Sequence, residues 1–172
     1  MKCLKRIVLG LSTVALLSLG STVLLPQGNN RGEAKATIGS AHVSIDYGRP
    51  SLQGRDPLKM ISPGQVWRLG ASAPTTIDTD HDLLFGNTRV PKGKHILLAQ
   101  MVEPGKWVLL VSNKAASEYE PSAKIAEAPM KLNEASDSVE EMTIKVSGHG
   151  NQGDIEVAWG TSRLAASFNV AE

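Results

Sequence analysis

The alternation of polar and apolar residues in short runs is the feature that most constrains the fold of this chain. Residues 42–47, His-Val-Ser-Ile-Asp-Tyr, alternate with period two, which predicts a strand with one buried face. Gly86-Asn87 is a tight-turn signal, and Glu103-Pro104-Gly105 separates two apolar runs as a hairpin turn would. The predicted strands are residues 42–47, 65–71, 75–79, 83–90, 94–102, 106–112, 139–146, 154–159 and 163–170.

Helical signals are weak in the same part of the chain. Residues 115–128 contain helix-forming residues, but a proline interrupts them, so we expect a loop that could contain one helical turn. Many short strands joined by Gly- and Pro-rich turns predict an all-β fold, here a single β-sandwich of eight or nine mostly antiparallel strands over residues 37–172. Trp67, Trp107 and Trp159 each fall on a predicted strand, and we expect them in the core.

Residues 1–36 have a different character from the rest of the chain. Lys2, Lys5 and Arg6 precede an uncharged run of 19 residues, 7–25, which predicts a secretory signal peptide. A run of this length can also span a bilayer, so an uncleaved membrane anchor is the alternative. Both interpretations place the following domain in the periplasm or the extracellular space, with membrane contact only through the uncharged run if it stays uncleaved.

The charge balance changes when the chain is divided after residue 36. Of the 18 basic and 17 acidic residues, the first 36 positions hold five and one, so the domain carries 13 and 16 and a net charge of −3. A mildly acidic domain argues against a nucleic-acid partner, because proteins that bind nucleic acids usually have a basic stripe. The single cysteine, Cys3, excludes an intrachain disulfide framework.

Motifs of known catalytic chemistry are absent from the sequence. The chain contains no Gly-x-Ser-x-Gly, His-Glu-x-x-His or phosphate-loop motif. The four histidines have no metal-ligand spacing, although strands could bring His42 and His95 together, and we expect neither a metal nor a cofactor. The acidic run 78–82 around His81 lacks the glycine and distal glutamate of a calcium loop, so we expect a solvated turn.

The densest grouping of arginines and aromatic residues lies between positions 45 and 76. It consists of Tyr47, Arg49, Arg55, Trp67 and Arg68. Arginine presents five donors in a rigid fork and stacks on aromatic rings, so these five residues are the candidate ligand-binding site for an anion or a sugar. In the structural alternative, the arginines bond the carbonyl groups of a long loop while their stems pack on the aromatic rings.

A set of motifs extends over most of the predicted domain. The set comprises Tyr47-x-Arg49-Pro50, Gly54-Arg55, Val66-Trp67-Arg68-x-Gly70-Ala71, Thr75-Thr76, Val90-Pro91-Lys92-Gly93-Lys94, Trp107-Val108 with Val111-Ser112-Asn113-Lys114, and Ala158-Trp159-Gly160-Thr161. Over about residues 40–170 it resembles the exported bacterial proteins of the domain of unknown function family 2911. The chain departs from that pattern at Ser72-Ala73-Pro74, where Asn-Glu is usual, and at His95, where tyrosine is usual. The resemblance implies a compact β-sandwich in or outside the cell envelope and no established reaction.

Three functions remain open from the sequence. The leading hypothesis is a non-catalytic exported protein that binds an unidentified envelope ligand or partner protein through the arginine and aromatic cluster. One alternative is a hydrolase of an envelope substrate, which requires a histidine within hydrogen-bonding distance of a serine or carboxylate in a cleft. The other is a purely structural or assembly role, in which the arginines are buried and bonded to carbonyl groups.

Overall fold

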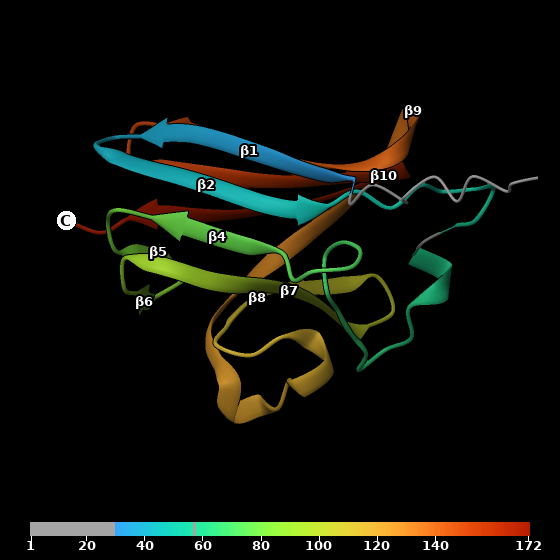
Figure 1. Cartoon of the computed structure of the whole chain (residues 1–172), viewed down its shortest axis with the longest axis horizontal. Helices are drawn as coiled ribbons and strands as arrows, with labels where there is room; N and C mark the ends of the chain where they lie inside the picture. Colours follow the sequence, from blue (N-terminus) through green and yellow to red (C-terminus); the bar gives the residue numbers. More distant parts are fainter. Residues whose placement is uncertain (1–29, 57) are drawn as a thin grey trace, which may run out of the picture.

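The computed structural model describes residues 30–56 and 58–172, which form an all-β fold (Figure 1). Ten strands join in one antiparallel sheet, and short 3₁₀ turns are the helical segments among the described residues. The strands are β1 (Arg31–Ile38), β2 (Ala41–Gly48), β3 (Val66–Trp67), β4 (Thr76–Thr79), β5 (Leu83–Phe85), β6 (Thr88–Val90), β7 (Gly93–Glu103), β8 (Lys106–Ser112), β9 (Lys124–His149) and β10 (Gln152–Val170). The 3₁₀ turns are η1 (Leu58–Met60), η2 (Ala116–Glu118) and η3 (Pro121–Ala123).

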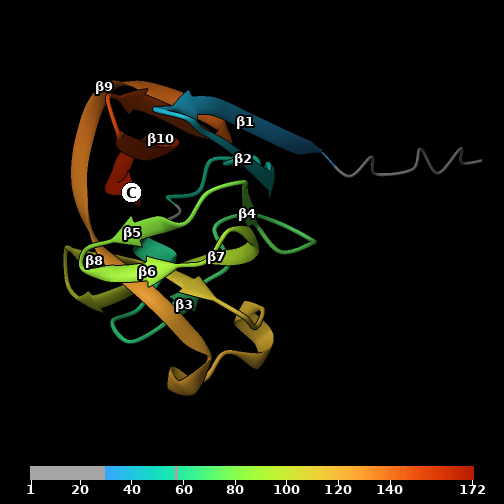
Figure 2. The same cartoon turned by 90° about the vertical axis from the view of Figure 1, so that its left-hand side faces the viewer.

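The sheet folds over on itself into a sandwich-like arrangement. Its strand order is β1-β2-β4-β7-β8-β9-β10-β5-β6, and β3 pairs with β7 outside this path. The long strand β9 connects the two sides, because Lys124–Met130 pair with β8 and the following residues pair with β10 (Figure 2). As a result β1 lies close to β9, and buried apolar side chains of both strands belong to one core.

Strand β10 bends back on itself near Gly160. The ladder to β9 shifts register on both sides of this residue, and Gly160 has a φ of 61°, a conformation that glycine adopts easily. The two arms come together, since the backbone N–H of Val170 donates to the carbonyl of Asn151 at 2.8 Å. The two strands predicted for 154–159 and 163–170 are therefore the two arms of one bent strand.

The core is built from the inward positions of alternating strands. In β2, Ala41, Val43 and Ile45 are buried while His42 and Ser44 face outward, as the period-two pattern predicted. Large side chains that are almost completely buried include Ile38, Ile77, Leu83, Phe85, Leu97, Leu109, Met142 and Phe168. Branched aliphatic residues thus supply most of the core, and the apolar area that they remove from water is the main stabilising term.

The folded domain begins earlier than the sequence suggested. We expected it to start at residue 37, but β1 runs from Arg31 and pairs with β2 along its whole length. The inward residues of β1 include only small ones, Ala34 and Ala36, before Ile38. Charged residues at the other positions made this strand look like a linker rather than part of a sheet.

Two further segments differ from their predictions. Residues 65–71 hold only the two-residue strand β3, because the chain turns at Leu69, whose φ is 51°. For residues 115–128 we expected a loop with at most one helical turn. The structure has two 3₁₀ turns there, and β9 begins at Lys124, within the segment. Alanines and an exposed proline occupy this part of β9, so its sequence lacks the usual β-branched signal.

The predicted signal peptide or anchor is almost entirely outside the described residues, and Cys3 lies there too. Within residues 30–56 and 58–172 no helix has the length and apolar character needed to cross a bilayer.

Candidate functional site

Tyr47 and Arg49 close the gap between β2 and β9. The buried hydroxyl of Tyr47 donates to the carbonyl of Ile144 at 3.3 Å. The Nε of Arg49 donates to the carbonyl of Met142 at 3.4 Å, and its Nη2 lies 3.1 Å from a carboxylate oxygen of Glu141. Both side chains therefore bond to groups at one edge of β9.

The residues that follow Arg49 continue this contact through their backbones. The N–H of Met142 donates to the carbonyl of Pro50 at 2.9 Å, and the N–H of Leu52 donates to the carbonyl of Glu140 at 2.8 Å. Ser51 forms an isolated bridge with Glu141. The segment 50–52 thus pairs with an edge of β9 that would otherwise present free backbone groups.

Two glycines allow this region to pack closely. A Cβ atom on Gly32 would lie 2.6 Å from the ring of Tyr47 and 3.0 Å from Cδ of Arg49. A Cβ atom on Gly48 would lie 2.0 Å from the carbonyl oxygen of Ala71, a backbone atom that cannot move away cheaply. Tyr47 and Arg49 therefore cross over Gly32 side by side, and the loop at Ala71 rests on Gly48.

The other two arginines of the predicted site bond locally. The guanidinium of Arg55 donates to the carbonyls of Leu52 at 3.1 Å and Ser51 at 3.2 Å. Arg68 donates to the carbonyl of Ser72 at 3.3 Å and lines a small cavity of about 110 Å³. No hydrogen bond or ion pair among the described residues joins Arg49, Arg55 and Arg68 to one another.

Trp67 belongs to a cluster of three tryptophans. Its ring stacks on Trp159 with centroids 5.9 Å apart and meets the edge of Trp107 at 6.5 Å. Trp107 is buried in the core as predicted, whereas Trp67 and Trp159 are partly buried against it. One face of Trp67 is therefore covered by another ring, and the cluster contributes packing to this end of the molecule.

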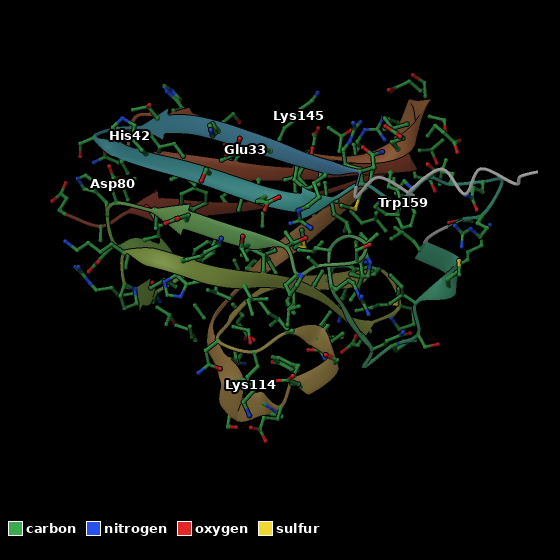
Figure 3. All side chains as sticks on the ribbon, viewed as in Figure 1. Glu33, His42, Asp80, Lys114, Lys145 and Trp159 are labelled. Carbon is green, nitrogen blue, oxygen red and sulfur yellow. The ribbon has the colours of Figure 1, made fainter. Side chains whose placement is uncertain are left out.

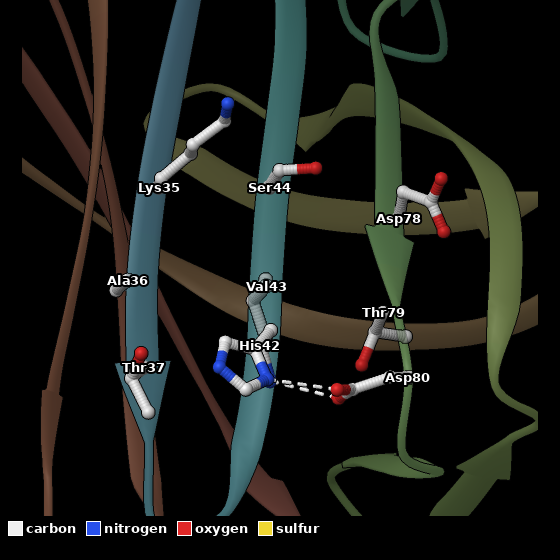
Figure 4. A pocket seen from close by; sticks show the side chains of 9 residues that line it. All are labelled: Lys35, Ala36, Thr37, His42, Val43, Ser44, Asp78, Thr79 and Asp80. Atoms are coloured by element: carbon white, nitrogen blue, oxygen red, sulfur yellow. Dashed lines mark hydrogen bonds and ion pairs between the residues drawn. The ribbon is translucent and has the colours of Figure 1, made fainter.

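A groove lies on the outer face of β1, β2 and β4 (Figure 4). Its volume is about 620 Å³. Its lining residues are Lys35, Ala36, Thr37, His42, Val43, Ser44, Asp78, Thr79 and Asp80. A second groove of about 460 Å³ on the same face shares Ser44 and Asp78 and reaches Lys94 of β7. His42 and Asp80 mark the end of the molecule opposite Trp159 (Figure 3).

Asp80 is the centre of a hydrogen-bonded chain at this end of the groove. Its Oδ1 lies 2.8 Å from the backbone nitrogen of His42 and 2.8 Å from Nδ1 of His81, and its Oδ2 lies 2.8 Å from Nδ1 of His42. His81 continues the chain through Nε2, which lies 3.2 Å from Oγ of Ser40. Hydrogen bonds from His81 first, and then from His42, hold the pKa of the Asp80 carboxyl well below its usual range.

The remaining histidines do not join this chain. His95 lies with Nε2 2.7 Å from the carbonyl oxygen of Pro91, and His149 is exposed at the end of β9. In the described part of the chain no group of three or more His, Cys, Asp or Glu side chains is arranged to hold a metal ion. The Nδ1 atoms of His42 and His81 both point at the Asp80 carboxylate, so they do not converge on a position for a metal ion.

The sequence analysis did not predict the groove, although the strand pattern already indicated which of its residues face outward. The alternation of 42–47 and 75–79 already placed His42, Ser44 and Asp78 on outward faces. The pairing of β2 with β4 sets Ser44 directly opposite Asp78, and nothing in the 31 residues from 45 to 75 gives that register. The run 78–82 was interpreted only as a solvated turn, which hid its contacts with Ser40 and His42.

The fold and these contacts define an all-β, sandwich-like domain whose arginine and aromatic motif contacts loops and the sheet and whose outer face carries two adjoining grooves. Over residues 29–168 the chain matches the model of a family described as a protein of unknown function, DUF2911, and it belongs to that family. The family expected from the motifs is thereby confirmed. Neither the curated proteins nor the solved structures contain a match to the chain.

Proposed function

We propose that this protein is a binding domain that takes a polar envelope ligand on the outer face of β1, β2 and β4. The observation that carries the proposal is the pair Ser44 and Asp78, which both grooves share. Their side chains make no hydrogen bond or ion pair with another described residue, so they are available to a ligand. The envelope location rests on the signal or anchor predicted for residues 1–36.

The other acidic groups on this face are already engaged. Asp46 pairs with Arg31 at 2.8 Å, Glu33 pairs with Lys35 at 2.9 Å, and Asp80 is bonded by two histidines. Asp78 is left as a carboxylate beside a free hydroxyl. This combination accepts hydrogen bonds from a protonated amine and exchanges them with sugar hydroxyls.

The two adjoining grooves suit an extended ligand of more than one ring. Lys35, which pairs with Glu33, lies in the first groove and Lys94 in the second, so donors for sugar hydroxyls flank the central pair Ser44 and Asp78. An amino-sugar chain of the cell envelope has hydroxyls and amines at the spacing of successive rings, and we assign this class of ligand to the face.

The arginine and aromatic cluster takes a different part in this proposal from the one expected. Arg49, Arg55 and Arg68 donate to backbone carbonyls, and Trp67 stacks on Trp159. These contacts support the structural interpretation of the cluster. We therefore assign ligand binding to the groove. The arginine and aromatic cluster stabilises the sheet on which the groove lies.

Isothermal titration calorimetry with a glucosamine tetramer and with its N-acetylated counterpart tests the proposal. We expect the protein to bind the tetramer with free amines more tightly, and Asp78→Asn to weaken that binding at least about tenfold, because a hydrogen bond to a charged group contributes about 1.5–3 kcal/mol. Glu134→Gln removes an exposed carboxylate on β9 and should leave binding unchanged. Absence of binding by the wild-type protein, or equal binding by Asp78→Asn, would sink the proposal.

A further inference from the structure

Ser40 lies in the tight turn between β1 and β2, and its hydroxyl meets an imidazole. Ile38 pairs with Ala41, so Gly39 and Ser40 form a two-residue hairpin loop. His81 follows β4, which lies beside β2, and the pairing of these strands brings its Nε2 to 3.2 Å from Oγ of Ser40. Neither Ser40 nor His81 lines the groove, but Asp80 does, so this contact lies at the end of the groove and away from Ser44 and Asp78.

The hydrogen bonds fix which nitrogen of His81 is the acceptor. A carboxylate oxygen only accepts, so the 2.8 Å contact between Nδ1 of His81 and Asp80 requires a proton on Nδ1. In the neutral ring Nε2 then has a free lone pair, and the Ser40 hydroxyl donates to it. The backbone N–H of His42 and the Nδ1 of His42 hold the Asp80 carboxylate in place.

This arrangement has the three parts of an activated nucleophile. A hydroxyl lies within hydrogen-bonding distance of a base, and a carboxylate orients the base from its other nitrogen. The chain of contacts runs from Ser40 through His81 to Asp80, and both distances lie within the range of ordinary hydrogen bonds. We propose that Ser40 is a reactive serine that attacks small activated esters and organophosphorus compounds.

The reaction with an ester balances in two steps. The Oγ of Ser40 forms a bond to the carbonyl carbon while its proton moves to Nε2 of His81, and the alkoxide leaving group takes that proton as its bond to carbon breaks. Water then attacks the acyl-serine and gives a proton to Nε2 of His81. As the bond between the acyl carbon and Oγ breaks, His81 returns that proton to Oγ, and a carboxylic acid leaves. The exposed position of Ser40 on a hairpin turn favours small substrates that need no enclosing pocket.

A fluorophosphonate probe tests Ser40 without knowledge of a natural substrate. The serine oxygen bonds to phosphorus, fluoride leaves, and the proton passes through His81 to solvent. Intact mass and peptide mapping should show one adduct at Ser40. It should form at least about 100 times faster than at the exposed Ser117, since general-base catalysis contributes about 100–10,000-fold.

Matched variants separate the proposed chemistry from simple exposure. We expect Ser40→Ala to lose the adduct, and His81→Ala and Asp80→Asn to slow labelling to the rate at Ser117. His95→Ala, which removes an imidazole bonded only to a carbonyl, should label like the wild type. A circular dichroism spectrum and a melting temperature show whether each variant is folded. If His81→Ala does not fold, Asp80→Asn alone tests the dependence of labelling on the hydrogen-bonded chain.

Two outcomes would overturn the proposal: folded wild-type protein that shows no faster labelling at Ser40 than at Ser117, or equal labelling of Ser40 in His81→Ala and Asp80→Asn. Glu134→Gln, on β9 and in contact with none of Ser40, His81 and Asp80, should label at the wild-type rate; labelling is read by mass, whereas amino-sugar binding is read by calorimetry. Failure of the amino-sugar binding proposal is therefore distinguishable from failure of this one.

Discussion

The hydroxyl of Tyr47 donates a hydrogen bond to the carbonyl of Ile144, a residue 97 positions away in the sequence. Together with the bonds that Arg49 and the segment 50–52 make to Glu140–Met142, it covers one edge of β9. An uncovered edge would leave buried carbonyl groups unpaired and could pair with another chain. The Tyr-x-Arg-Pro motif is thereby explained by the closure of the sheet.

Tyr47→Phe should destabilise the protein by about 1–3 kcal/mol, because it leaves the carbonyl of Ile144 without its donor in a buried position. Urea denaturation followed by tryptophan fluorescence measures the change. Tyr119→Phe removes a hydroxyl from a partly exposed tyrosine near η2 and should change stability by less than about 0.5 kcal/mol. Equal stabilities of Tyr47→Phe and wild type would show that the hydrogen bond from Tyr47 to the edge of β9 does not stabilise the fold.

The arginines of the predicted site should differ in how much they stabilise the fold. Arg49→Ala removes both a hydrogen bond to Met142 and an ion pair with Glu141, so we expect a loss of about 1–2 kcal/mol after allowance for partial exposure. Arg68→Ala breaks one bond within its own loop and should cost under about 0.5 kcal/mol. The midpoints of urea unfolding compare the two variants.

Equal, large losses of stability in Arg49→Ala and Arg68→Ala would mean that the contacts seen for Arg68 understate its role. If neither variant loses stability but both lose binding of an amino-sugar or anionic ligand, the cluster is the ligand site that the sequence first suggested. The comparison therefore decides between the structural and the binding interpretations of the motif.

The strand pattern could be predicted where alternation is strong, and it failed where the inward residues are small. Residues 42–47 have large apolar residues on one face, residues 106–112 form a continuous apolar run, and both are strands. β1 and the first half of β9 rely on alanines, whose burial removes little apolar area from water, so the pattern is faint. The sheet order itself depends on long-range pairing that no local pattern contains.

The roles of the candidate site residues also depend on contacts between distant parts of the chain, which the sequence alone does not predict. The composition of the cluster was visible in the sequence, but its two possible roles differ only in what the guanidinium groups touch, and their partners include Met142 and Glu141, about 90 positions away. Ser40 belongs to no sequence motif, and Asp80 and His81 stood out only as part of the acidic run 78–82, which was interpreted as a turn. They become a chain of hydrogen bonds only because β1–β2 and β4 end beside each other.

The stability contributed by Asp80 should depend on pH in the acid range. Its pKa in the folded protein lies below the unfolded value of about 4, so its contribution is complete above about pH 5 and is lost as the pH falls toward the folded pKa. The gap in melting temperature between wild type and Asp80→Asn should therefore narrow as the pH falls from 5 through 3 to 2. Glu134→Gln, which removes an exposed carboxylate on β9, is the matched control, and an Asp80→Asn gap that stays constant from pH 5 to pH 2 would contradict the prediction.

Thr75 should stabilise the protein through its hydroxyl more than through its methyl group. The residue is fully buried, and its Oγ1 donates to the carbonyl of Leu69 at 2.7 Å, where the chain turns with a positive φ. Thr75→Val keeps the shape but leaves that carbonyl unpaired, so we expect a loss of about 1–3 kcal/mol. Thr75→Ser keeps the hydroxyl and loses one methyl group, which costs about 0.8 kcal/mol. Urea unfolding should rank the three proteins with valine least stable, and a valine variant as stable as the serine variant would show that the turn does not depend on this bond.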